Sequence, residues 1–359
     1  MKKYETYKDS GLEWLGMVPE HWGIVPLKYL LSEPLQYGAN ESADNCNPSE
    51  PRYIRITDIT EDGKLRKSTY RTLPYQKAEG YMLKKGDILF ARSGATVGKT
   101  FIFEEDYDAC FAGYLIKASC NEKLLPMFLY YFTSSNSYEN WKNSTFNQAT
   151  IQNIGADKYC TLPIPTPSSE EQEGIINFLS HNVAQIDALI SEKEKMVEDL
   201  KAYRSSLITE TVTKGLDKDV KMKDSGVEWI GKMPQNWKLL KLKRIVNLKS
   251  GTSLTSDRIL DEGKYQVFGG NGPRGYIDDY TNEGNFVLIG RQGALCGNIN
   301  YANGKFWATE HAIICYPLKE IDTIWLGETL RAMNLNQYSI SAAQPGLAVE
   351  RINELLSVH

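Results

Sequence analysis

The chain has 359 residues, of which 42% are hydrophobic and 24% charged, and its formal net charge at pH 7 is −4. This length and composition are typical of a globular protein with two or three domains and argue against an intrinsically disordered chain. The apolar runs are shorter than the roughly 18 residues of a membrane helix, and the amino terminus lacks the apolar segment of a signal peptide. We therefore expect a soluble cytoplasmic protein with no membrane partner.

Cysteine spacing predicts neither a metal site nor a disulfide framework. The sequence contains no C-x-x-C pair and no cysteine with a histidine at zinc-ligand spacing. We expect reduced, mostly buried thiols and no bound metal. The six cysteines are Cys46, Cys110, Cys120, Cys160, Cys296 and Cys315.

A module at the start of the chain recurs farther along. Residues 7–30 and 222–245 share the pattern D-S-G-x-E-W-x-G-x-x-P-x-x-W without a gap, so that Trp237 follows Trp22 by 215 positions. One repeat at this spacing predicts two domain-sized halves rather than a solenoid. Its tryptophans could stack on bases, but their position beside Pro and Gly favours a packed turn at the start of each domain. They are Trp14, Trp22, Trp229 and Trp237.

Two stretches are locally basic despite the negative net charge. Residues 63–78 contain five Lys or Arg and residues 232–250 contain six, and neither stretch has an acidic residue. Such runs can contact phosphates. A solvated helix face or strand edge is an equally good interpretation of either stretch alone.

An Arg-containing turn after a short apolar strand also occurs twice. Residues 87–98, D-I-L-F-A-R-S-G-A-T-V-G, and residues 286–297, F-V-L-I-G-R-Q-G-A-L-C-G, align with Arg92 on Arg291 at an offset of 199. Because this offset is smaller than 215, the intervening loops differ in length. Two domains that share these motifs but differ in loop length indicate two binding modules of different specificity.

The first of these turns superficially resembles a phosphate-binding P-loop. Residues 93–100 end in Gly-Lys-Thr, but the preceding glycine is Gly94, one position from where the P-loop pattern requires it. We instead predict a strand-turn-strand from which Arg92 and Lys99 project. Both side chains could reach a phosphate or a base edge, or could pair with the acidic residues 104–106.

The chain lacks the motifs of a self-contained enzyme. Residues 268–272, F-G-G-N-G, match the short F-x-G-x-G pattern of amino-methyltransferases, but such enzymes also need an Asn/Asp-Pro-Pro-aromatic motif, and the sequence has no Pro-Pro dipeptide. The four histidines are scattered, and no carboxylate pair with a catalytic lysine is repeated. We therefore predict a binding protein without catalytic residues.

A long helix is predicted between the two repeats. The proline-rich residues 162–167 end in a helix start with Ser168 or Ser169 as N-cap, and the helix continues over residues 169–213 until Gly215. About 45 residues at 1.5 Å rise correspond to a rod of roughly 65 Å. Apolar residues three and four apart form a stripe of coiled-coil type, which predicts a partner-binding face. They include Ile175, Leu179, Val183, Ile186, Ile190, Val197, Leu200 and Leu207.

Two further segments repeat in the same order. Residues 128–141 and 325–337 are predicted to form equivalent helices, and residues 148–154 resemble residues 344–352. Together these patterns predict an α+β protein made of two similar mixed α/β domains joined by a long coiled-coil-type helix. The boundaries that we expect are residues 1–165 and 217–359 for the domains and 166–216 for the helical spacer.

The paired D-S-G motifs, the D-I-L-F-A-R-S-G-A-T-V-G turn and the lead P-I-P-T-P-S-S-E-E-Q-E-G-I-I into the long helix identify a family pattern. Over nearly its whole length the chain resembles the specificity subunit of type I restriction-modification enzymes. The resemblance implies two target-recognition domains that each read one half of a split double-stranded DNA sequence. It also implies that two modification subunits dock on the helices and that restriction subunits join through them. S-adenosylmethionine, ATP and magnesium would then be needed only by those partners, and this chain would carry no cofactor.

Within this interpretation, Arg, Lys and Gln on the glycine turns are expected to read bases and the basic stretches to contact phosphates. An alternative for Arg92 and Arg291 is a structural role, in which they hold their turns through hydrogen bonds to carbonyls. The candidate DNA-binding residues are Arg66, Lys67, Arg71, Arg92 and Lys99 in the first domain and Lys249, Arg258, Arg274, Arg291, Gln292 and Lys305 in the second.

The resemblance also has a departure. The family pattern ends in a second P-x-P-x-x-E-Q segment and another long helix antiparallel to the first, whereas this sequence stops at residues 355–359. We expect the apolar stripe to be covered by a second copy or by modification subunits, or the isolated chain to be inactive. Two other interpretations are a targeting fragment of a fused restriction-methylation enzyme and a scaffold that joins two proteins without DNA.

Overall fold

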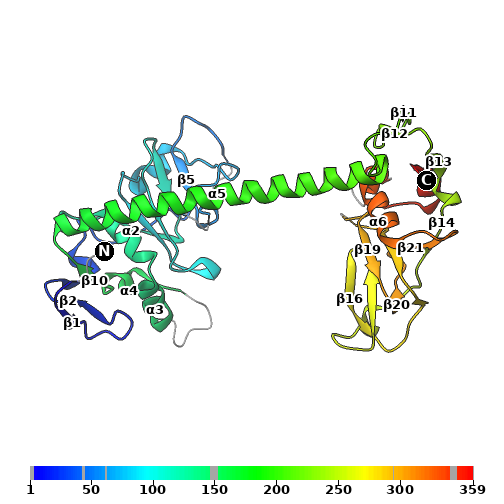
Figure 1. Ribbon diagram of the computed structural model, residues 1–359. Helices are drawn as coiled ribbons and strands as arrows, with labels where there is room; N and C mark the ends of the chain where they lie inside the picture. The colour runs from blue at the N-terminus through cyan, green and yellow to red at the C-terminus, as the bar shows by residue number, and fades with distance from the viewer. Residues whose placement is uncertain are drawn as a thin grey trace. The chain divides into compact units, whose positions relative to one another are not determined.

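The computed structural model describes residues 4–42, 45–60, 63–145, 153–293, 295–339 and 346–358. The chain divides into two compact units, Met1–Ile190 and Ser191–His359. The division falls within the long helix α5, Ser169–Lys214 (Figure 1). The first is called unit 1 and the second unit 2.

Each unit begins with the repeated module folded as a small hairpin. In unit 1, β1 (Tyr7–Asp9) pairs with β2 (Met17–Pro19). In unit 2, β11 (Met222–Asp224) pairs with β12 (Lys232–Pro234). Both turns are closed by an aspartate oxygen that accepts a hydrogen bond from a glycine N–H two residues later, at 2.9 Å. Trp14 and Trp229 pack on the core of their own unit, which confirms the predicted packed turn.

The same four-stranded antiparallel sheet occurs in both units. Unit 1 has the strand order β4-β9-β6-β7, and unit 2 has the order β14-β21-β18-β19. The central strands are short apolar runs that are buried on both faces. The strands of unit 1 are β4 (Gln36–Tyr37), β6 (Ile88–Ala91), β7 (Thr100–Ile102) and β9 (Leu115–Ala118). Those of unit 2 are β14 (Val246–Ser250), β18 (Phe286–Gly290), β19 (Ile299–Ala302) and β21 (Ala312–Pro317).

The two faces of strand β6 contribute to different cores, because successive side chains of a strand point to opposite sides. Ile88 and Phe90 belong to a cluster with the helices of unit 1. Leu89 and Ala91 belong to a second cluster, which includes Phe111. The sheet thus separates a helical layer from a second, smaller β layer.

That second layer differs between the units. In unit 1 it contains β5 (Arg52–Ile54) parallel to β8 (Ala109–Phe111). In unit 2 the equivalent parallel pair is extended into four strands, in the order β16-β15-β20-β17. These strands are β15 (Tyr265–Gly269), β16 (Gly272–Ile277), β17 (Asn282–Glu283) and β20 (Lys305–Ala308).

The predicted equivalent helices are present, but each is broken in two, so the prediction of single helices over residues 128–141 and 325–337 was wrong. In unit 1, α2 (Pro126–Thr133) ends before α3 (Asn136–Thr145). In unit 2, α6 (Thr323–Ala332) is followed by a short 3-10 helix, Leu335–Tyr338. The second break occurs at Asn334, whose φ of +47° lies in the left-handed region and cannot continue an α-helix.

The remaining short elements close each unit. In unit 1 they are α1 (Tyr75–Ala78), α4 (Ala156–Cys160) and the pair β3 (Gly23–Pro26) and β10 (Pro163–Thr166). In unit 2 they are α7 (Val349–Asn353) and the pair β13 (Leu239–Lys241) and β22 (Leu356–Val358). Most of the predicted similarity between residues 148–154 and 344–352 lies outside the described residues.

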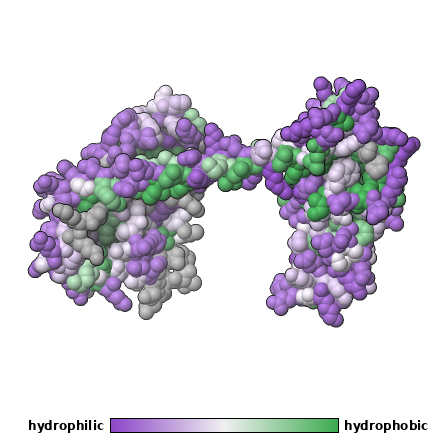
Figure 2. Space-filling view, viewed as in Figure 1, coloured by the Kyte–Doolittle hydropathy of each residue, from purple (hydrophilic) through white to green (hydrophobic). Residues whose placement is uncertain are grey.

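Helix α5 confirms the predicted helix and extends it by one residue. Ser168 is its N-cap: its hydroxyl oxygen accepts from the Glu171 N–H at 3.3 Å, and the Glu171 carboxylate accepts from the Ser168 N–H at 3.4 Å. Gly215 follows the helix with a φ of +75°. Hydrophobic residues gather along its exposed stretch (Figure 2). Among the described residues, no helix has the length and apolar character needed to cross a membrane.

Candidate functional site

Backbone hydrogen bonds fix the Arg92 turn of unit 1. The Gly98 N–H donates to the Ala91 carbonyl at 2.7 Å, and the Arg92 N–H donates to the Tyr114 carbonyl at 3.0 Å. The Arg92 carbonyl in turn accepts from the Ile154 N–H at 2.8 Å. The turn is therefore held between strand β6, the segment before β9 and the segment before α4.

The Arg291 turn of unit 2 has the same set of bonds. The Gly297 N–H donates to the Gly290 carbonyl at 2.7 Å, and the Arg291 N–H donates to the His311 carbonyl at 2.8 Å. The Arg291 carbonyl accepts from the Leu347 N–H at 2.9 Å. The sequence repeat thus corresponds to a repeated backbone frame. The strand-turn-strand predicted around residues 93–100 is confirmed, and the same arrangement recurs in unit 2.

The two arginine side chains make different contacts in this common frame. The Arg92 guanidinium lies 4.8 Å from the centre of the Tyr37 ring, whereas Arg291 donates to the Ser250 hydroxyl at 3.2 Å. Tyr37 and Ser250 occupy equivalent places, each just before a glycine (Gly38 or Gly251) that lies against backbone carbonyls of the neighbouring strand. Within the described residues, neither guanidinium donates to a carbonyl, so the backbone itself closes each turn.

Other polar side chains surround these arginines. In unit 1, Tyr114 is 62% exposed. In unit 2 its counterpart His311 shares a hydrogen bond of 2.9 Å between Nδ1 and the Gln292 Oε1. Among the described residues, the buried Nε of Arg92 has no hydrogen-bond partner. The two turns therefore carry different polar side chains in a common backbone frame.

Sequence reasoning missed Tyr37, Tyr114, Ser250 and His311. Tyr37 and Ser250 end the edge strands β4 and β14. Tyr114 and His311 immediately precede the strands β9 and β21. A polar or aromatic residue next to a buried strand was the available signal, but it does not reveal which strands pair.

The glycine-rich residues 268–272 belong to a hairpin in unit 2. Phe268 is buried, and a Cβ added at Gly290 would overlap the Gly270 carbonyl, so the hairpin packs directly on the Arg291 turn. The Asn298 side chain also donates to the Asn271 side chain at 2.6 Å. The pentapeptide therefore supports the turn through close backbone packing.

The remaining candidates of unit 1 are cations on loops. Arg66 and Lys67 are exposed on the segment before α1, and Lys99 is half-buried at the end of the Arg92 turn. Arg71 lies on the same segment as Arg66, and its guanidinium donates to the Tyr70 carbonyl at 2.8 Å. The structure thus groups Arg66, Lys67 and Arg71 on one segment and places Arg92 and Lys99 on another.

In unit 2, aromatic rings support most of the candidate cations. Lys249 lies 5.5 Å from the Tyr316 ring, and Arg258 lies 5.7 Å from the Trp307 ring. Lys305 lies 4.6 Å from the Tyr280 ring and 3.9 Å from a Glu283 oxygen. Arg274 is exposed on β16, in the hairpin that packs on the Arg291 turn.

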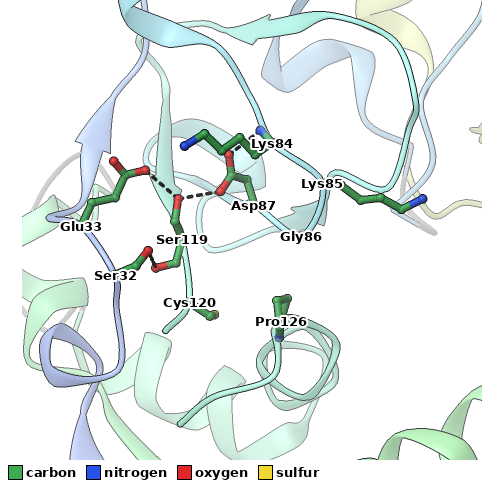
Figure 3. A pocket seen from close by; sticks show the side chains of 9 residues that line it. All are labelled: Ser32, Glu33, Lys84, Lys85, Gly86, Asp87, Ser119, Cys120 and Pro126. Atoms are coloured by element: carbon green, nitrogen blue, oxygen red, sulfur yellow. Dashed lines mark hydrogen bonds between the residues drawn. The ribbon is translucent and has the colours of Figure 1, made fainter. Parts of the chain in front are cut away.

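A polar cavity of ≈ 400 Å³ in unit 1 contains no candidate (Figure 3). Here the Ser119 hydroxyl lies 2.8 Å from a Glu33 oxygen and 2.5 Å from an Asp87 oxygen, between the two carboxylates. Hydrogen bonds from Lys117 and Ser119 lower the pKa of Glu33. Both carboxylates are already bonded to Ser119, and Glu33 is also paired with Lys117 at 2.9 Å, so the polar groups of this cavity satisfy one another. Among the described residues, no cluster of three or more His, Cys, Asp or Glu could hold a metal, and all six cysteines are free thiols.

The predicted partner stripe on α5 divides into two parts. Ile175 packs against the core of unit 1, and Leu179 is half-buried. The other six residues are between 38% and 59% exposed. They are Val183, Ile186, Ile190, Val197, Leu200 and Leu207. Ile175 therefore packs the helix against unit 1, and the exposed part of the stripe begins at Val183.

Residues 36–199 and 234–355 match the family described as the type I restriction modification DNA specificity domain. The chain belongs to this family. Each matched segment includes one of the two Arg turns. DNA target recognition is thus the function of this specificity chain, and its role is targeting rather than catalysis.

Curated relatives agree with this assignment. The specificity subunit of the type I restriction enzyme EcoprrI from Escherichia coli is 29% identical over 310 residues, which are 84% of this chain and 74% of that protein. The MjaVIII specificity subunit from Methanocaldococcus jannaschii is 25% identical over 269 residues, 73% of this chain and 57% of that protein.

Two structures share the fold at low sequence identity. One chain comes from a study of complex assembly and conformational transition of the type I R-M system; it has a TM-score of 0.64 at 18% identity, covering 95% of this chain and 86% of that one. The HsdS subunit from Thermoanaerobacter tengcongensis has a TM-score of 0.53 at 16% identity, covering 95% and 85%. These similarities confirm the predicted fold class.

Proposed function

We propose that the specificity chain reads a bipartite DNA target, one half with the Arg92 turn of unit 1 and the other with the Arg291 turn of unit 2. The observation that supports this proposal is the repeated backbone frame with unlike side chains. The common frame places an arginine at the same backbone position in both turns, while Tyr37 and Tyr114 in one unit and Ser250 in the other give each turn different neighbouring side chains.

The candidate residues then fall into two classes of contact. Arg92, Arg291 and Gln292 lie on the turns and would contact base edges, where arginine is the commonest partner of guanine. The other candidates would contact phosphates and set the position of the chain without reading sequence. They are Arg66, Lys67, Arg71 and Lys99 in unit 1 and Lys249, Arg258, Arg274 and Lys305 in unit 2.

Residues 166–216 would act as the spacer between the two recognition domains, residues 1–165 and 217–359. Two modification subunits would dock on the exposed stripe of α5, and restriction subunits would join through them. S-adenosylmethionine, ATP and magnesium would be bound by those subunits. Insertion of one helical turn, about 5.4 Å, should then change the preferred gap in the DNA target by one or two base pairs.

The test is to co-express the chain with its modification subunit and map methylated adenines across the host DNA. The wild-type chain should give a split motif with a fixed gap. Arg92→Ala should relax or abolish one half of the motif and Arg291→Ala the other, because loss of a bidentate base contact costs about 1–3 kcal/mol. Lys28→Ala, which removes an exposed cation of unit 1 outside the turns, is the matched control. An unchanged motif in both arginine variants would refute the assignment.

A further inference from the structure

Unit 1 contains a second cavity, which we call the tyrosine pocket. Its volume is ≈ 400 Å³, within the usual range for small-ligand sites. It lies at the start of strand β5, away from the residues of the Arg92 turn. Its lining includes Glu50, Arg52, Asp108 and the rings of Tyr70, Tyr75 and Tyr107.

A buried arginine forms one wall of the tyrosine pocket. Arg52 is only 7% exposed and lies 5.4 Å from the Tyr70 ring and 6.0 Å from the Tyr107 ring. Its guanidinium donates to the Tyr107 hydroxyl and to the Arg66 carbonyl, both at 2.9 Å. Within the described part of the chain it forms no ion pair. Since an arginine side chain has five N–H donors, Arg52 retains donors for an acceptor that enters the pocket.

Two carboxylates supply hydrogen-bond acceptors to the tyrosine pocket. Asp108 accepts a hydrogen bond from the Tyr75 hydroxyl at 2.5 Å, and Glu50 accepts from the Thr72 hydroxyl at 3.3 Å. Each carboxylate has capacity for further donors, because it offers about four lone-pair positions. The pocket thus combines flat aromatic walls, a guanidinium donor and carboxylate acceptors.

These groups match a planar ring that carries both a carbonyl and an amino group. Guanine and cytosine have both, whereas adenine lacks the carbonyl and thymine lacks the amino group. Arginine donates to the acceptor edge of guanine, carboxylates accept from amino groups such as the cytosine N4, and aromatic side chains stack on either base.

The tyrosine pocket is also joined to the segment proposed to contact phosphates. Tyr70 lies between Lys67 and Arg71 in the sequence, and Arg52 holds the Arg66 carbonyl. DNA bound along this segment would bring a base to the mouth of the pocket. In unit 2 the strand position equivalent to Arg52 holds Gln266, so the arginine wall is particular to unit 1.

We propose that the tyrosine pocket receives an unstacked guanine or cytosine from the bound DNA. This inference rests on the proposed DNA contacts of unit 1. The pocket stabilises a base that has left the helix, so it favours sites where a guanine or cytosine unstacks easily. It adds sequence selectivity at a position that the Arg92 turn does not contact.

The test uses the full chain and duplexes that each carry one unpaired G, C, A or T, with a fully paired duplex as reference and fluorescence anisotropy as the measurement. Tyr75→Ala removes a half-exposed wall of the pocket, and Ser49→Trp fills the pocket from its exposed rim. Tyr29→Ala removes a comparably exposed tyrosine elsewhere in unit 1 and is the control. Saturation-transfer NMR with free dGMP distinguishes a nucleotide-binding site from a site for a base within DNA.

The wild-type chain should bind the G or C bulge at least fivefold more tightly than the A or T bulge. Both pocket variants should lose this preference and retain wild-type affinity for the paired duplex, and Tyr29→Ala should retain both. Equal affinity for all four bulges, with paired-duplex binding intact, would overturn this inference alone. So would binding of free dGMP without discrimination among the bulges. If the wild-type chain binds none of the duplexes, that result would instead overturn the proposed DNA contacts.

Discussion

The packing of the start of helix α5 in unit 1 depends on one buried amide side chain. Gln172 is fully buried, and its side chain accepts a hydrogen bond from the Leu125 N–H at 2.8 Å. It also donates to the Lys123 carbonyl at 2.9 Å and to the Pro167 carbonyl at 3.1 Å. These bonds connect the first turn of α5 to the segment before α2. Gln172→Met, which keeps much of the volume but removes all three bonds, should therefore loosen the helix start.

The expected loss follows from those three bonds. Each contributes about 1 kcal/mol net, and the buried Leu125 N–H left without a partner adds about 1 kcal/mol, so the total is about 4 kcal/mol. This is a large part of the roughly 5 to 15 kcal/mol that stabilises a domain. With an m-value of about 2 kcal/mol per molar urea, the unfolding midpoint of unit 1 should fall by about 2 M.

Urea unfolding followed by tryptophan fluorescence measures this shift, since Trp22 donates to Glu171 at the same helix start. Native-state hydrogen exchange of the Leu125 amide adds a local measurement, and its protection should fall in the variant. Gly174→Ala, a change on an open face of the same helix, is the control and should be neutral or stabilising. An unchanged midpoint and unchanged Leu125 protection in Gln172→Met would refute the reasoning.

Three other perturbations probe the stripe, the helix cap and the Arg291 turn. Ile186→Glu changes a side chain that is 54% exposed, so the chain should fold normally but bind the modification subunit more weakly in co-purification. Acidification should loosen the start of α5 through the Glu171 carboxylate. Burial is the largest single influence on the pKa of Glu171 and would raise it. The hydrogen bonds that the carboxylate accepts, of which the one from His21 has the largest effect, together outweigh burial and lower the pKa. The stabilisation is therefore present above the unfolded pKa of about 4.3 and is lost as the pH falls through the lower folded value, which a pH series of the unfolding midpoint measures. Gly290→Ala would place a methyl group on the Gly270 carbonyl and should destabilise unit 2 by about 1–3 kcal/mol in thermal unfolding.

Each of these has a matched control. Glu192→Ala alters an exposed residue of α5 outside the stripe and should leave subunit binding unchanged. Glu171→Gln should flatten the acid response, and a full response in that variant would assign it to other groups. Gly80→Ala places a methyl group in open space, so equal stability losses at Gly80 and Gly290 would contradict the packing argument.

Local patterns in the sequence predicted the elements that depend on neighbouring residues. The apolar run at 88–91 became a buried strand, and the serine, glutamate and glutamine after the proline-rich lead became the start of α5. The break in unit 2 was missed because asparagine also occurs inside helices, so the local sequence does not show that Asn334 adopts the left-handed conformation. Tertiary packing decides whether such a residue continues a helix or ends it.

The environment of each arginine was harder to predict because it depends on pairing between distant strands. Tyr37 reaches Arg92 through the antiparallel pairing of β4 with β9 and of β9 with β6. A sequence without an alignment does not give the partners of a two-residue edge strand. The candidate residues on the turns could therefore be named from the sequence, but their neighbours could not.

The closure of both Arg turns by main-chain atoms has a consequence for substitutions at the neighbouring positions. Since the bonds of Arg92 N–H and Arg291 N–H end on carbonyl oxygens, the side chains at Tyr114 and His311 can be replaced without loss of those bonds. We therefore expect a substitution at either position to change the surface beside its turn and to leave the unit folded.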